Sequence, residues 1–395
     1  MKKRILLIIF IAACAALLFA CRNDKGSSES SIPPSVEAEK KREFAVETMI
    51  DTMTDEEKVG QLFMISLDGG KDGPALAVTG AIRDIINTYK PGGVFFMDEN
   101  IQTREQVKAF ISDLKSCSTF PMFIAAEEEG GDLSPLAKIG YEKKASAAEI
   151  GDTDNPDNPD YATSYAYEVM SEIGKELKEL GFNFNLAPLC NVKSDEKNYI
   201  WGSRAYSSSA VLTADLANTA AQALRDNKII PVLKYFPGIG EVSAYTDKGA
   251  VKLNLDFERL YEKGIRVFEK GISYHPCIMT SHVSLPTLLD SNIPQSLSEE
   301  MIQNFLRDQL TFTGIVMTDS LRQKAITKYY KPGEAAVLAV KAGNDLLFMP
   351  EDFAKAYNAV LKAVKDGEIS ALRLDMSLRR ILYRKYDFGI WPETE

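Results

Sequence analysis

The residues best suited to chemistry lie at the end of a short apolar run. Residues 314–321 read Gly-Ile-Val-Met-Thr-Asp-Ser-Leu, so that apolar residues lead directly into Thr318 and Asp319. A short, continuously apolar segment is typical of a strand in a parallel sheet that is covered on both faces. In such sheets the chemistry lies where strands end and loops begin. Asp319 stands at such an end, and its function depends on the partner that it faces.

Polar residues also lie at or near the ends of the other apolar runs. They are mostly carboxylates, amides and a lysine: Glu127, Glu128, Glu129, Asn185, Asn191, Lys234, His282, and Asn344 with Asp345 near the start of the last run. A site of this composition suits polar, uncharged ligands with many hydroxyl groups. Because His275 and His282 are the only histidines of the chain, no histidine-based metal site is expected. We expect neither a metal nor a cofactor.

Eight apolar runs of strand length are available to position these side chains. They cover residues 61–66, 92–97, 122–126, 182–189, 229–233, 277–283, 315–318 and 345–349. Helical periods separate them, for example in residues 166–180 and 257–268. Asp256 is a predicted N-cap, and residues 296–299 match a capping box. A strand–helix alternation repeated about eight times favours a (β/α)₈ TIM barrel, an α/β fold, over an open doubly wound sheet. We expect residues 43–395 to form this single domain.

The first residues predict an export signal. Residues 1–4 are basic, residues 5–20 are almost wholly apolar, and Leu18-Phe19-Ala20-Cys21 places a small residue directly before a cysteine. This pattern resembles a bacterial lipoprotein signal, in which residues 1–20 are removed and Cys21 is lipidated. The alternatives are an ordinary cleaved signal peptide and an uncleaved anchor. Residues 22–42 are polar and rich in Pro, Ser, Glu and Lys, which predicts a flexible tether after Cys21. The expected location is the cell envelope, on the outside of the cytoplasmic membrane or on the outer membrane.

Charge and cysteine content exclude some classes of protein. The 46 lysines and arginines face 56 acidic residues, which gives a formal net charge of −10. An acidic chain does not suit nucleic acid. Cys117, Cys190 and Cys277 are too scattered for a disulfide framework or a metal knuckle. We expect a monomer with a carbohydrate substrate and a membrane contact through the lipid anchor.

Several motifs together resemble one enzyme family, the one-domain bacterial β-N-acetylglucosaminidases (β-N-acetylhexosaminidases) of glycoside hydrolase family 3. The similarity covers roughly residues 53–388. The motifs are residues 58–63, 92–94, 129–131, 186–188, 202–204, 234–240, 279–283, 306–308, 314–319 and 342–345. The resemblance implies a retaining mechanism with Asp319 as the nucleophile. It places Lys234 and Arg204 at sugar-contacting positions, where the alternative is a structural ion pair. His282 also matches a family position, with a satisfied strand-end histidine as the alternative.

The chain departs from the family where the acid/base is expected. The family pattern Lys-His-Phe-Pro-Gly-His-Gly becomes Lys-Tyr-Phe-Pro-Gly-Ile-Gly in residues 234–240, so Tyr235 replaces a histidine. Tyr245 replaces the aspartate that orients the catalytic histidine, and Asp247 stands in the place of that histidine. After the third run, Glu127 replaces a shorter Asp and Pro135 replaces a sugar-binding arginine.

Two hypotheses follow. In the first, the protein is a surface-anchored glycosidase that cleaves β-linked N-acetylglucosamine or a related sugar from cell-wall or other glycans. Asp247 is then the general acid/base, helped by Tyr245, with Glu127 or Glu241 as substitutes. In the second, the barrel binds sugar or peptidoglycan fragments and does not turn them over. Asp319, Lys234 and Arg204 favour the first hypothesis, and the loss of the histidine, its aspartate and the arginine favours the second.

Overall fold

The computed structural model describes residues 34–67, 73–194, 200–289 and 291–391. The described residues from Arg42 onward belong to one compact unit, which is described below, and those from Pro34 to Lys41 are assigned to another. The predicted signal peptide and Cys21 lie outside the described residues. Within the described residues, no helix combines the length and apolar character that crossing a membrane requires.

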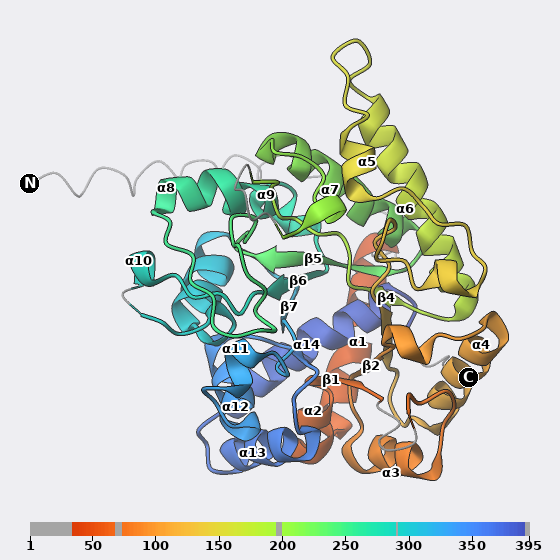
Figure 1. Ribbon diagram of the computed structural model, residues 1–395. Helices are drawn as coiled ribbons and strands as arrows, with labels where there is room; N and C mark the ends of the chain where they lie inside the picture. Colours follow the sequence, from red (N-terminus) through yellow and green to blue (C-terminus); the bar gives the residue numbers. More distant parts are fainter. Residues whose placement is uncertain (1–33, 68–72, 195–199, 290, 392–395) are drawn as a thin grey trace, which may run out of the picture. The chain divides into compact units, whose positions relative to one another are not determined.

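Eight parallel strands form the centre of the fold (Figure 1). They are β1 (Phe63–Ser66), β2 (Gly93–Phe95), β3 (Phe123–Ala126), β4 (Phe184–Asn185), β5 (Ile230–Phe236), β6 (Cys277–Thr280), β7 (Ile315–Thr318) and β8 (Leu347–Phe348). Each strand from β1 to β7 pairs with its neighbours in sequence within this range, and β1 pairs with β8. A parallel bridge between Met317 and Leu346 joins β7 to β8 and closes the ring. The predicted (β/α)₈ barrel is therefore confirmed, with its eight strands in the expected order.

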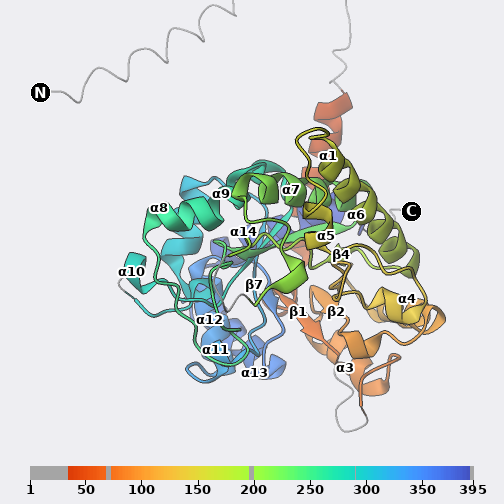
Figure 2. The same ribbon diagram turned by 45° about the horizontal axis from the view of Figure 1, so that its top comes forward.

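Helices surround the strands. They are α1 (Pro34–Thr52), α2 (Asp55–Gly60), α3 (Gly80–Tyr89), α4 (Arg104–Cys117), α5 (Ala147–Gly151), α6 (Tyr161–Leu180), α7 (Ala210–Asp226), α8 (Phe257–Leu260), α9 (Arg266–Glu269), α10 (Pro286–Leu289), α11 (Lys324–Thr327), α12 (Pro332–Ala342), α13 (Phe353–Lys365) and α14 (Ala371–Asp387). A π-helical segment, Glu300–Gln309, precedes β7. Figure 2 shows α6 and α7 on one side of the strands and α12 and α13 on another. Long apolar stripes on these helices cover the outer face of the barrel.

The interior of the barrel is filled by side chains. Met64, Phe95, Phe123, Phe184, Met279, Met317 and Phe348 belong to one buried apolar cluster inside the ring. The rings of Phe123 and Phe184 lie 5.0 Å apart, within the usual range for a packed aromatic pair. Because this core leaves no room for a ligand, chemistry is confined to the ends of the strands.

Two local predictions are wrong. Helix α1 begins at Pro34, so residues 34–42 are helical and do not belong to a flexible tether. Proline suits the first helical turn, and the glutamates and lysines that follow are good helix formers, so this polar composition fits a solvated helix. The capping box at residues 296–299 is also absent: the next helical segment begins at Glu300, and the Ser296 hydroxyl contacts His282 instead. By contrast, the predicted N-cap is confirmed, because Asp256 accepts a hydrogen bond from the backbone of Arg259 at 2.8 Å.

Candidate active site

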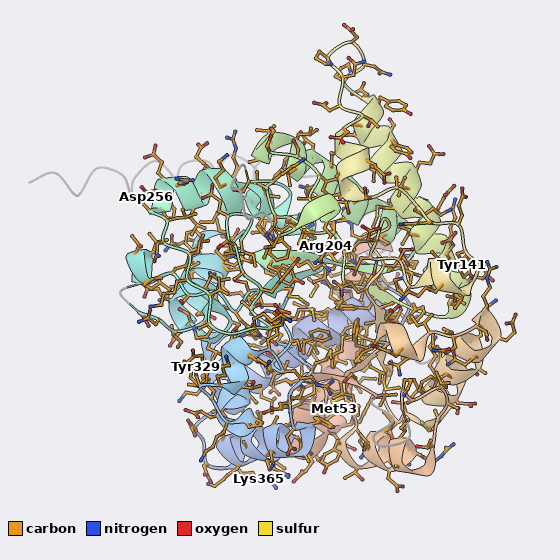
Figure 3. The ribbon with its side chains drawn as sticks, in the orientation of Figure 1. Met53, Tyr141, Arg204, Asp256, Tyr329 and Lys365 are labelled. Carbon is orange, nitrogen blue, oxygen red and sulfur yellow. The ribbon has the colours of Figure 1, made fainter. Side chains whose placement is uncertain are left out.

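Four charged side chains meet at the carboxyl end of β3 and β5. Glu127 and Glu129 directly follow β3, Lys234 belongs to β5, and Arg204 ends a short turn after β4. Arg204 binds Glu129 with two bonds, from Nε to Oε2 at 2.8 Å and from Nη2 to Oε1 at 2.9 Å. Lys234 forms ion pairs with Glu127 and with Glu129 Oε1, the latter at 2.6 Å. Figure 3 labels Arg204, which lies near the centre of the view.

Burial and mutual attraction control the charge of this group. Burial alone would raise the pKa of Glu129, but Arg204 and Lys234 outweigh it and hold that pKa at about 2. Burial likewise acts to lower the pKa of Lys234, and the attraction of Glu127 and Glu129 raises it overall. Lys234 has no exposed surface, whereas 29% of the Glu127 side chain is exposed. Lys234 therefore holds Glu127 in place, while part of the Glu127 side chain remains exposed.

Asp319 lies at the end of β7 with both carboxylate oxygens held. Its Oδ1 accepts a hydrogen bond from the backbone N–H of Ser320 at 2.6 Å, and its Oδ2 accepts one from Gln323 Nε2 at 2.9 Å. Only 7% of the residue is exposed. Burial raises the pKa of Asp319, while His282, Ser320 and Gln323 act in the opposite direction. The result is a fixed, poorly solvated carboxylate at the end of β7.

His282 is engaged by protein groups at both ring nitrogens. Nε2 lies 2.9 Å from the Ser320 carbonyl, which can only accept, so Nε2 carries the proton. Nδ1 lies 2.7 Å from the Ser296 hydroxyl and accepts from it. Burial lowers the pKa of His282, in keeping with a neutral ring. This arrangement corresponds to the satisfied strand-end histidine rather than to a sugar contact. By holding Ser320, His282 orients the backbone N–H that binds Asp319.

Tyr235 is affected by the charges of both groups. It follows Lys234 in β5 and is partly buried. Burial raises the pKa of its hydroxyl, and the charges of Lys234, Asp319, Glu127 and Arg204 also act on it. Asp319 and the Glu127–Arg204–Lys234 group therefore share one end of the barrel, with Tyr235 among them.

The loop after β5 is attached to the loop after β4. Trp201 Nε1 donates to the Ile239 carbonyl at 3.2 Å, and the Tyr245 hydroxyl donates to the Ile200 carbonyl. The Trp201 ring lies 5.8 Å from both the Tyr235 and the Tyr245 rings. Because the Tyr245 hydroxyl is used in this way, the expected hydrogen bond from Tyr245 to Asp247 is absent.

Asp247 is not joined to Asp319 by any hydrogen bond of the described residues. Half of its side chain is exposed, and its carboxylate forms an ion pair with Lys248 at 3.0 Å. Glu241, the other acid of this loop, pairs with Arg259 at 3.1 Å. The structure thus brings Glu127, Arg204, Lys234, Tyr235 and Asp319 to one end of the barrel but leaves Asp247 facing solvent.

A cavity of about 230 Å³ opens beside Glu127. Its walls come from the ends of β2 and β3 and include Phe96, Asp98, Ser134, Pro135 and Lys138. Pro135 occupies the position at which the family resemblance placed an arginine, so one wall that would be charged is apolar here. Among the described residues, no group of three or more His, Cys, Asp or Glu side chains is arranged to hold a metal ion.

Two contributors to this site are not among the site residues predicted from the sequence, although Glu129 is one of the polar residues noted at the strand ends. Glu129 makes the bidentate bond to Arg204, and Gln323 holds Asp319. Glu129 belongs to a motif that the sequence did reveal, in residues 129–131. Gln323 had a weaker signal: it follows Asp319 by four residues, in the turn before α11.

Comparison with known proteins agrees with this geometry. Residues 54–383 match the model of the glycosyl hydrolase family 3 N-terminal domain. Beta-hexosaminidase A of Pseudoalteromonas piscicida is 28% identical over 326 residues, which are 76% of this chain and 54% of that protein. Beta-hexosaminidase LpqI of Mycobacterium bovis BCG is 25% identical over 397 residues, 96% of each chain. The chain belongs to glycoside hydrolase family 3.

Solved structures of the same family are also similar to this chain. A family 3 β-N-acetylglucosaminidase from Paenibacillus sp. FPU-7 is similar with a TM-score of 0.79 and 29% identity, over 87% of this chain and 64% of that one. The chain spans about half the length of the Pseudoalteromonas protein and somewhat less than two thirds of the Paenibacillus protein.

Proposed function

We propose that this protein is a retaining glycoside hydrolase that cleaves β-linked N-acetylglucosamine or a closely related sugar, with Asp319 as its nucleophile. The observation that carries the proposal is the carboxylate of Asp319, buried at the end of β7 and held by Ser320 and Gln323. In a retaining reaction such a carboxylate attacks the anomeric carbon and forms a glycosyl-enzyme, which water then hydrolyses. The names of its beta-hexosaminidase relatives supply the proposed sugar.

The neighbouring groups have the polarity needed to bind a sugar. Glu127 and Arg204 are both partly exposed. Hydroxyl groups of a sugar can donate to a carboxylate and accept from a guanidinium group. Tyr235 adds an aromatic face and a hydroxyl. The cavity beside Glu127 supplies a place for the ring of the sugar. Hydrolysis of an aryl N-acetyl-β-glucosaminide by the purified protein is the direct test of the proposal.

Asp247 is proposed as the general acid/base, acting after a movement of the loop between β5 and α8. Protonation matters most when the leaving group is poor. Asp247→Asn is therefore expected to lower kcat/KM, which reports formation of the glycosyl-enzyme, by about 10²-fold for a phenyl glycoside and much less for a dinitrophenyl glycoside. Steady-state rates on the two substrates measure this. Asp308→Asn, an exposed carboxylate far along the chain, serves as the control. Equal rates for Asp247→Asn and wild type on both substrates would show that Asp247 is not the acid.

A second candidate function follows from the exposed position of Asp247. If no group protonates the leaving oxygen, the barrel binds sugar without cleaving it. Under this alternative, N-acetylglucosamine raises the melting temperature of the protein, but no aryl glycoside is hydrolysed, not even the dinitrophenyl substrate. Hydrolysis that Asp319→Asn abolishes would exclude it.

The pH dependence of the reaction is expected to respond to Gln323. The Gln323 amide donates to Asp319 Oδ2 and thereby stabilises the charged carboxylate. Gln323→Leu removes this bond, so the pKa of Asp319 is expected to rise further. A nucleophile must be ionised, and activity is lost as pH falls through its pKa. The acid limb of kcat/KM against pH should therefore move to higher pH in Gln323→Leu, with a smaller change at alkaline pH. An unchanged acid limb would contradict the assignment.

Anchoring through Cys21 is proposed on the strength of residues 1–21, and action on cell-wall glycans on that predicted location together with the family. Cys21→Ser is expected to abolish incorporation of labelled palmitate and to shift the protein from the membrane fraction to the soluble fraction. Retention of the label in the variant would count against lipidation at Cys21.

A further inference from the structure

A cavity at the opposite end of the barrel is lined by arginines. It encloses about 330 Å³, and its walls include Arg42, Thr313, Arg379, Arg380, Tyr383 and Arg384. Thr313 precedes β7, whereas Asp319 follows it, so the cavity lies at the end of β7 away from the proposed active site. Most of the lining belongs to α14. We propose that this cavity is a binding site for phosphate groups, either free or as the esters of a lipid headgroup.

The arginines are held in place by carboxylates and keep further donors. Arg42 pairs with Asp387 through two bonds, at 2.6 Å and 2.8 Å, and Arg384 shares the same carboxylate at 3.1 Å. Arg379 forms two bonds to Glu47, at 2.6 Å and 2.8 Å. Each guanidinium has five N–H groups, so these bonds leave donors over. The buried Nε of Arg384 has no hydrogen-bond partner among the described residues.

The region carries more positive than negative charge. Asp345 forms an ion pair with Arg380 at 3.0 Å. It also pairs with Arg307 and Arg373, which are not among the residues that line the cavity. Six guanidinium groups are thus paired with three carboxylates: Arg42, Arg307, Arg373, Arg379, Arg380 and Arg384 with Glu47, Asp345 and Asp387. Among other acids, Glu43 acts on Tyr383, and Asp375 is paired with Lys58. Burial lowers the pKa of Arg384, and Arg42 adds to this effect against the attraction of Asp387.

An anion is the ligand that this excess would attract, and phosphate suits it best. The planar guanidinium fork matches two phosphate oxygens, and these charge-assisted bonds are among the stronger hydrogen bonds in proteins. General attraction cannot explain such binding, because the chain as a whole has a net charge of −10. The volume is at the lower end of the range for small-molecule sites, which suits a phosphate with a short ester group.

Two sources of phosphate share this chemistry. One is a soluble phosphate or phosphate monoester. The other is an anionic phospholipid, since Arg42 ends the basic run Lys40-Lys41-Arg42 and a segment of this kind is attracted to anionic membranes. The site does not depend on the proposed glycosidase activity, and failure of either proposal leaves the other standing.

The first experiment measures how inorganic phosphate changes the melting temperature of the full chain at constant ionic strength. Phosphate stabilises most proteins through general exclusion, but this contribution is common to all variants. Differences between variants therefore report the site. Arg379→Gln is expected to weaken phosphate binding about tenfold, because it removes one charged donor. Glu47→Gln is expected to strengthen binding, because it frees Arg379 from its carboxylate. Arg266→Gln, an exposed arginine on α9, is the matched control and should behave as wild type.

Each variant has its own expected direction relative to wild type, so either one that folds tests the proposal, and the two together separate a phosphate site from a loss of packing. A loss of packing would affect Arg379→Gln and Glu47→Gln in the same direction, whereas a phosphate site separates them. The proposal is overturned if phosphate shifts the melting temperatures of wild type, both variants and the control by equal amounts.

A second experiment distinguishes the two sources. Binding of the full chain to phosphatidylglycerol vesicles is divided by its binding to phosphatidylcholine vesicles, so that any apolar anchor contributes equally to both. If the site takes lipid headgroups, Arg379→Gln should lower this ratio about fivefold, and Arg266→Gln should not. An unchanged ratio together with a variant-dependent response to inorganic phosphate assigns the site to soluble phosphate.

Discussion

Asp319→Asn is expected to lower kcat/KM for an aryl N-acetyl-β-glucosaminide by about 10⁴-fold, comparable with the loss of a catalytic carboxylate in other enzymes. Asparagine keeps the shape of the side chain and can still accept from the Ser320 N–H, but it cannot form the glycosyl-enzyme. Steady-state kinetics measure the loss. Mass spectrometry of wild type incubated with a slow substrate should in addition detect a sugar attached to the peptide that contains Asp319, and the variant should show none.

The stability of Asp319→Asn separates a chemical loss from unfolding. Burial raises the pKa of Asp319, so the folded protein keeps this proton to a higher pH than the unfolded chain does. Folding stability from this residue therefore declines as pH rises from the ordinary carboxyl pKa through the raised one. The neutral asparagine lacks this decline, and its melting temperature at pH 7 should equal or exceed that of wild type.

The matched control for Asp319→Asn is Asp84→Asn, an exposed carboxylate on α3, which should leave both activity and stability unchanged. An Asp319→Asn variant that folds and keeps more than a tenth of wild-type activity would remove Asp319 from the role of nucleophile.

The fold could be predicted from the sequence because its signals are local. Each strand is a short apolar run, and each run is followed by a helical period, so the order of the elements can be followed along the chain. Asp319 could be found for the same reason, since the end of an apolar run marks the end of a strand. The start of α1 at Pro34 was missed because polar composition alone does not distinguish a solvated helix from a tether.

The partners of the site residues could not be predicted in the same way. Lys234 reaches Glu127, which lies 107 residues earlier in the chain, and only the closed ring of strands brings the two together. His282 and Ser296 show the same limitation. A serine that fits a helix cap by its spacing is instead bonded to a histidine on a neighbouring strand end. Spacing in sequence cannot decide whether the Ser296 hydroxyl bonds a helix backbone or the His282 ring, because that depends on burial and on distance in space.

Asp345 illustrates this limitation most clearly. In the sequence it stands near the start of the last apolar run, close to residues that end other strands. In the structure it precedes β8, and its carboxylate accepts a hydrogen bond from the backbone N–H of Val316 in β7 at 3.0 Å. It has no exposed surface. It also accepts from the Ser377 hydroxyl at 2.7 Å and pairs with Arg307, Arg373 and Arg380. One carboxylate therefore pairs with three guanidinium groups that come from two separate parts of the chain.

Asp345→Asn is expected to lower the free energy of unfolding by about 3–5 kcal/mol, as the loss of one partner from a buried ion pair does. The arginines would remain in place without a counter-charge, and the cost of burying them would no longer be offset. Urea denaturation measures the change. Asp352→Asn is the matched control: it alters a mostly exposed ion pair with Lys355 at a helix N-cap, where asparagine also caps well, and should cost less than about 1 kcal/mol.

The pH dependence provides a second test of Asp345. Burial acts to raise the pKa of Asp345, but Arg307, Arg380 and Arg373 outweigh it and lower that pKa overall. The folded state therefore binds this proton more weakly than the unfolded chain, and the stabilisation is present above the ordinary carboxyl pKa and lost as pH falls through the lowered one. The difference in stability between wild type and Asp345→Asn should thus be constant near neutral pH and shrink only in strong acid. A difference that shrank near pH 6 would mean that Asp345 is not held ionised by these arginines.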